Sequence, residues 1–150
     1  MNLSEHFTVE EMTFSETALR HGLDNSPPDS AVENLKRLCA ELLEPARALL
    51  GDVPFHVTSG YRALPVNALV GGVSNSAHLT GRACDFIPQG PDLRAAFDLI
   101  RQSELPYDQV IYECAAWIHL AVAADGVPIR RQALAAVRGA DGRFSYQAVS

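Results

Sequence analysis

The chain has 150 residues, of which 47% are hydrophobic and 20% charged, and its formal net charge is −6. This length suffices for one domain with a buried core, and the composition carries no signature of disorder. The negative charge argues against nucleic acid or an anionic membrane surface as a partner, because both require a basic face. No apolar run reaches the roughly 18 residues of a membrane span. We therefore expect one domain over residues 1–150, monomeric, without nucleic-acid or membrane partners.

Two further features bear on the compartment. The opening residues MNLSEHFTVEEM lack the basic and apolar regions of a secretory signal, so we expect a protein that is cytoplasmic as synthesised. The three cysteines are an odd number without C-x-x-C spacing, which favours buried thiols in a reducing compartment. A Cys84–Cys114 disulfide is the alternative.

The first third of the chain is predicted to be helical. Thr8 and Glu11 have the spacing of a capping box that opens a short helical turn. A second short helix is expected over residues 15–21, ended by Gly22. A longer helix follows, with a second capping box and a stripe of apolar residues every three or four positions. Its markers are a cap at Ser30 and Glu33, an interruption at Pro45 and an end at Gly51.

The rest of the chain alternates short strands with loops and one helix. Residues 67–75 read as a helical turn and a loop, and Asp92 after Pro91 starts a helix. The Asp141-Gly142 pair is a strong signal for a hairpin turn. Strands are expected over residues 54–59, 82–86, 109–112 and 118–122. This order predicts an α+β fold, with N-terminal helices packed on a small, mainly antiparallel sheet.

Candidate metal ligands fall on the strand-and-loop half. In the segment SAHLTGRACDF, His78 precedes Asp85 by seven residues, and Gly81 supplies the backbone freedom of the turn between them. His119 interrupts the apolar run WIHLAV. A catalytic zinc ion takes three such protein ligands and keeps one position open. A single histidine in an apolar strand is, however, more often a hydrogen-bonded core residue, so spacing alone leaves both interpretations open.

The order of these motifs resembles a known family. SGYR, then SAHLTGRACDF, then DQVIYECAAWIHLAV is similar to the zinc D-alanyl-D-alanine carboxypeptidases, which have the hedgehog/DD-peptidase fold. The opening LSEHFTVEEMTFSETALRHGLDN is similar to a small, phage-associated branch of that family. The resemblance implies that His78, Asp85 and His119 bind Zn²⁺. It also implies a peptidoglycan stem peptide as substrate.

Two catalytic roles follow from the same resemblance. Arg62 of SGYR matches an arginine expected to face the scissile carbonyl and stabilise its oxyanion, or to bind a substrate carboxylate. Some relatives have a glutamate three residues before the last histidine, but that position is Ala116 here. Glu113 is the carboxylate just upstream, and a hairpin would bring it near His119 as the general base. The alternatives are an exposed turn arginine and an exposed glutamate at a strand end.

We therefore expect a zinc metallopeptidase that hydrolyses stem peptides, as a D-Ala-D-Ala carboxypeptidase or as an endopeptidase of the L-Ala-D-Glu type. Without a secretory signal, the protein would reach the cell wall only after release from the cytoplasm, as a phage lysis protein does. The first alternative is a non-catalytic zinc module that binds peptidoglycan or forms part of a phage particle. The second is a metal-free domain in which the three residues are incidental.

Overall fold

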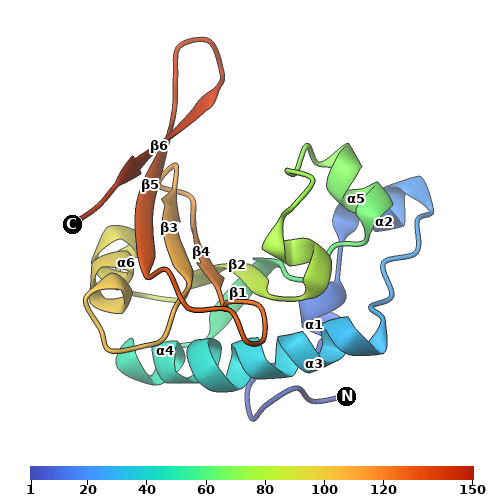
Figure 1. Ribbon diagram of the computed structural model, residues 1–150, viewed down its shortest axis with the longest axis horizontal. Coiled ribbons are helices and arrows are strands. Elements are labelled where there is room, and N and C mark those ends of the chain that lie inside the picture. The colour runs from blue at the N-terminus through green and yellow to red at the C-terminus, as the bar shows by residue number, and fades with distance from the viewer.

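The computed structural model describes residues 1–150 and contains one six-stranded sheet with helices against it (Figure 1). The strands follow the order β1-β2-β4-β3-β5-β6, and all neighbours are antiparallel except β3 and β5. This arrangement confirms the predicted α+β class with a mainly antiparallel sheet. The strands are β1 (Phe55–Ser59), β2 (Ala83–Pro88), β3 (Gln109–Glu113), β4 (Trp117–Ala121), β5 (Gln132–Arg138) and β6 (Phe144–Ala148). The helices outside the 29–49 segment are α1 (Val9–Thr13), α2 (Glu16–His21), α5 (Leu64–Leu69), the 3₁₀ turn η2 (Ala77–Thr80) and α6 (Leu93–Arg101).

The two N-terminal helices begin and end where local chemistry predicts. Thr8 and Glu11 form the reciprocal capping box of α1. Ser15 caps α2, and Gly22 ends it in the left-handed conformation with φ 63°. None of the helices has the length and apolar character required to cross a membrane.

Residues 29–49 form one rod along the base of the molecule (Figure 1), built from α3 (Asp29–Leu38), the π-helical turn η1 (Cys39–Leu43) and α4 (Glu44–Leu49). The predicted cap at Ser30 is wrong: α3 begins at Asp29 after Pro28, so Ser30 already lies in the first turn. Pro45 interrupts the α-helical ladder without ending the rod. Its ring and missing N–H disturb the preceding turn, which widens so that the N–H of Glu44 bonds the carbonyl of Cys39.

The second half follows the predicted order of elements with one shifted boundary. Helix α5 starts at Leu64 rather than near residue 67, because Pro65 fits the first turn of a helix, where no N–H is needed. Asp92 caps α6 by accepting from the N–H of Ala95. The Asp141-Gly142 turn joins β5 and β6 into a hairpin that projects from the body (Figure 1).

Alternation along the strands separates a core face from a polar face. Cys84, Phe86, Ile118 and Leu120 are fully buried in the main apolar cluster, which also holds residues of α3, η1, α4 and α6. Their neighbours in sequence point to the opposite face, because successive side chains of a strand alternate. The polar face thus receives Asp85 and His119 at the centre of the sheet.

Candidate metal centre

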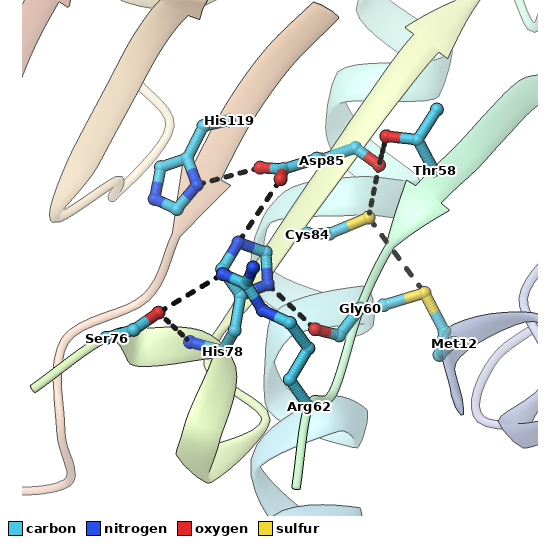
Figure 2. A network of polar contacts seen from close by, with 9 residues as sticks. All are labelled: Met12, Thr58, Gly60, Arg62, Ser76, His78, Cys84, Asp85 and His119. Carbon is cyan, nitrogen blue, oxygen red and sulfur yellow. Dashed lines mark hydrogen bonds and ion pairs between the residues drawn. The ribbon is translucent and has the colours of Figure 1, made fainter. Parts of the chain in front are cut away.

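The structure brings the three predicted ligands to one point on the polar face. Asp85 of β2 lies directly opposite His119 of β4, and His119 Nδ1 is 2.9 Å from Asp85 Oδ1 (Figure 2). His78 approaches from η2, with Nε2 3.3 Å from Asp85 Oδ2. One donor atom from each of the three lies within 4.8 Å of the others, and all three residues are buried.

The orientation of His78 is fixed by backbone groups on two segments. Its Nδ1 lies 2.7 Å from the carbonyl oxygen of Gly60, an atom that only accepts, so Nδ1 donates this hydrogen bond and Nε2 is the ring nitrogen that faces Asp85. Ser76 caps the turn by accepting from the His78 N–H. Gly81 ends η2 with φ 75°, close to the backbone of Ala31. These contacts aim Nε2 at Asp85.

The electrostatics and spacing fit a zinc ion. Burial opposes ionisation of Asp85, but the two histidines outweigh it and hold the pKa of this carboxyl well below its usual range. Tetrahedral zinc with bonds of about 2.0–2.1 Å places its ligand atoms about 3.3 Å apart. The two nitrogen–oxygen distances in this group, 2.9 and 3.3 Å, lie near this value. Two imidazoles and one carboxylate are also the donor set of many catalytic zinc sites.

Arg62 lies beside this group. Its N–H bonds the carbonyl of His78, and its guanidinium reaches Ser76 Oγ at 3.5 Å (Figure 2). Burial lowers the pKa of Arg62, and the nearby charge of Asp85 partly offsets that effect. The guanidinium Nε is buried without an acceptor. Arg62 is thus a half-buried cation at the centre, not the exposed turn arginine of the alternative interpretation.

Glu113 ends β3 on the same sheet face as His119. In the register, Ile111 is opposite His119 and Glu113 is opposite Trp117, so Glu113 and His119 are diagonal neighbours. Such neighbours are about 7–8 Å apart at Cα, within reach of a glutamate side chain. Burial raises the pKa of Glu113; His119 lowers it in part, and the charge of Asp85 raises it further. Glu113 is therefore a half-buried carboxyl whose pKa is raised above its ordinary value.

A cavity of about 450 Å³ opens beside Asp85 and Arg62. This volume lies in the range of small-ligand sites. Its walls come from β1, the segment at the start of α2, the end of α5 and Trp117 of β4. The lining residues are Phe14, Ser15, Glu16, Thr17, Thr58, Ser59, Tyr61, Arg62, Val70, Asp85 and Trp117. No local sequence signal indicated that residues 14–17 form a wall, because their approach depends on how α1 and α2 pack.

Other residues near the centre have structural roles. Cys84 points to the core, with Sγ 4.0 Å from Met12 Sδ, and all three cysteines are free (Figure 2). Asn25, between α2 and α3, donates to the carbonyls of Thr13 and Tyr61 and accepts from the N–H of Ala63. It therefore ties the backbone on both sides of Arg62 to α1. The only sequence signal for this role is an asparagine in a turn-rich segment.

The sequence of the chain also matches known proteins. A family model described as Peptidase M15 matches residues 5–121. The zinc D-Ala-D-Ala carboxypeptidase of Streptomyces albus G is 44% identical over 43 residues, which are 29% of this chain and 17% of that protein. The chain thus matches only a small part of that relative's length. The family match covers most of the chain, including all three candidate ligands, Arg62 and Glu113. The chain belongs to the peptidase M15 family.

Proposed function

We propose that this protein is a zinc metallopeptidase that hydrolyses peptidoglycan stem peptides. It would act as a D-Ala-D-Ala carboxypeptidase or as an endopeptidase at a bond such as L-Ala-D-Glu. The observation that carries the proposal is the convergence of His78, Asp85 and His119 within 4.8 Å beside a cavity. Family membership supports peptide hydrolysis, and the name of the matching Streptomyces enzyme supports the D-Ala-D-Ala bond.

In this proposal His78 Nε2, His119 Nδ1 and a carboxylate oxygen of Asp85 hold the zinc ion. Bound zinc would supply Lewis acidity, lowering the pKa of a water toward about 7 and polarising the scissile carbonyl. Three protein ligands leave a fourth position open, as catalytic zinc sites require. The hydrogen bond between His78 Nδ1 and the Gly60 carbonyl supports this assignment, because it leaves Nε2 as the ring nitrogen that can bind the metal.

Glu113 and Arg62 would handle the proton and the developing charge. Glu113 accepts a proton from the attacking water and returns it to the leaving amine. Its position on the His119 face and its raised pKa both suit a proton acceptor in a partly buried site. Arg62 donates to the carbonyl oxygen as negative charge develops there, from a guanidinium side chain that lines the cavity.

The test is digestion of purified muropeptides by zinc-loaded protein, with the products identified by mass spectrometry. Wild type should release either D-alanine or a fragment cut within the stem, which identifies the bond. Glu113→Gln keeps the size of the side chain and should lower kcat by about 100-fold to 10,000-fold with zinc retained. Glu104→Gln, at an exposed position away from the centre, is the matched control and should leave kcat unchanged.

Two outcomes would contradict parts of the proposal. A zinc-loaded wild type that binds muropeptides without cutting them would identify a binding module instead. Equal cleavage by wild type and Glu113→Gln would remove Glu113 from the mechanism and leave the zinc assignment in place.

A further inference from the structure

Trp117 touches both the cavity and the surroundings of the candidate base. It opens β4 two positions before His119, on the same face of the sheet, and pairs directly with Glu113. Its side chain also lines the cavity of about 450 Å³ together with Asp85 and Arg62. A group presented by Trp117 would therefore meet a peptide bound beside the metal ligands.

The indole Nε1–H of Trp117 is buried and has no acceptor within the protein. An indole nitrogen only donates, and the large majority of buried donors in proteins have a partner. Leaving one unpaired costs the desolvation penalty of that group without the hydrogen bond that would offset it. A ligand oxygen in the cavity that Trp117 lines would remove this penalty once a small rotation of the indole brings the N–H to the cavity surface.

Arg62, which lines the same cavity, also has a buried N–H without an acceptor. This group is the Nε–H of its guanidinium. The other two unpaired buried atoms, on Arg37 and Asn67, do not line this cavity. Arg62 is also the one basic residue among the lining residues. Two unpaired donors at one cavity indicate a ligand with acceptor oxygens, either carbonyl or carboxylate.

The turn before Trp117 is strained in a way that holds it opposite Glu113. Cys114 and Ala115 have φ of 52° and 59°, values that non-glycine residues rarely adopt. The turn is closed by a bond of 2.9 Å from the N–H of Ala116 to the carbonyl of Glu113. Such backbone strain is unfavourable and concentrates at functional sites. This turn keeps Trp117 directly opposite Glu113 in the β3–β4 pairing.

We propose that Trp117 Nε1–H donates a hydrogen bond to an oxygen of the bound peptide and so positions the substrate beside Glu113 and the metal ligands. The proposal rests on the proposed function insofar as the ligand is a stem peptide. The acceptor is either a backbone carbonyl or the C-terminal carboxylate. Both share the chemistry of an acceptor oxygen, and the two peptides used below distinguish them.

The experiment measures binding rather than hydrolysis. Zinc-loaded Glu113→Gln protein is titrated with an acylated tripeptide ending in D-Ala-D-Ala and with its C-terminal amide, and Kd is obtained by calorimetry. Trp117 is the only tryptophan of the chain, so its fluorescence reports on this cavity alone. We expect a saturable change in emission. In the same background, Trp117→Phe should raise Kd about tenfold, the effect of one lost hydrogen bond.

A second replacement separates the loss of the N–H from the change in ring shape that Trp117→Phe also causes. Because there is a single tryptophan, benzothienylalanine can be incorporated at this one position, and it replaces the N–H by sulfur while keeping the ring size. It should raise Kd as Trp117→Phe does, with zinc content and unfolding midpoint unchanged. Phe144→Leu, an exposed aromatic outside the cavity, should leave Kd unchanged.

If the tryptophan replacements raise Kd for both the free acid and the C-terminal amide, the acceptor is a backbone carbonyl. A penalty with the free acid alone identifies the carboxylate. Unchanged Kd in both tryptophan replacements overturns the proposal, as does absence of peptide binding by the Glu113→Gln protein. Binding with the expected penalty, but no hydrolysis by wild type, contradicts only the proposed function.

Discussion

His119 Nδ1 lies 2.9 Å from Asp85 Oδ1 because the two residues are directly opposite on β4 and β2. The backbone hydrogen bonds between the two strands fix the relative positions of such a cross-strand pair. His78 completes the group from a separate turn, whose own hydrogen bonds aim its Nε2 at the same carboxylate. The candidate centre therefore combines one cross-strand pair with a third candidate ligand, His78, that is held by a turn.

Asp85→Asn should abolish stoichiometric zinc binding. The amide removes the negative charge that both histidines face, so we expect metal affinity to fall by more than the roughly 100-fold that loss of an outer partner can cause. Elemental analysis after dialysis measures the zinc. EDTA should lower the unfolding midpoint of wild type but not of the variant. His56→Ala, an exposed histidine on β1, should keep full zinc, and one zinc per chain in Asp85→Asn would refute the assignment.

Glu113 should make the stability of the zinc-free protein depend on pH. Burial raises the pKa of Glu113, so between the unfolded and folded pKa values the folded state binds more protons than the unfolded state. Stability from this group is then present at low pH and lost as pH rises through that window. Glu113→Gln removes the effect. Its unfolding midpoint should match that of wild type near about pH 4 and exceed it at neutral pH.

The control for this titration is Glu104→Gln at an exposed position. Its difference from wild type should stay constant across the same pH range. A constant difference for Glu113→Gln as well would mean that the Glu113 carboxyl is as well solvated in the folded chain as in the unfolded one.

Gly81→Ala should destabilise the His78 turn through a steric clash. Both Gly81 and Gly126 have positive φ, at 75° and 76°, which costs about 1–2 kcal/mol for alanine. A Cβ at Gly81 would also lie 2.5 Å from the carbonyl oxygen of Ala31, whereas one at Gly126 meets nothing within 4 Å. Urea unfolding should therefore show a larger loss for Gly81→Ala than for Gly126→Ala. Zinc affinity should fall only in the former, and equal losses in the two variants would contradict the clash.

Asn25→Ala should loosen the segment that carries Arg62. The side chain makes three hydrogen bonds to backbone groups of α1 and of residues 61 and 63. Their removal leaves the N–H of Ala63 without its acceptor, so we expect a loss of about 1–3 kcal/mol in urea unfolding. Asp24→Ala removes an exposed side chain next to it and should change stability by about 0.5 kcal/mol or less. Similar effects for both variants would show that Asn25 does not anchor the segment.

Local signals in the sequence determined most of the elements. The cap at Thr8, the stop at Gly22, the cap at Asp92 and the turn at Asp141-Gly142 involve groups a few residues apart, so short stretches suffice to predict them. The same locality misled the prediction at Ser30, where a capping pattern falls inside a helix that Asp29 has already begun. The order of SGYR, the His78 motif and WIH also indicated which polar residues belong together.

Tertiary structure alone decided the rest, because it depends on contacts between residues distant in sequence. The parallel pairing of β3 with β5 and the order β1-β2-β4-β3-β5-β6 are not visible in any local pattern. The same holds for the carbonyl of Gly60 against His78 and for the wall that residues 14–17 give the cavity. The unpaired donors of Arg62 and Trp117 emerge only when packing excludes every other acceptor from around them. The sequence by itself named the candidate ligands, and the long-range packing decided which of their atoms face one another and what a substrate would meet beside them.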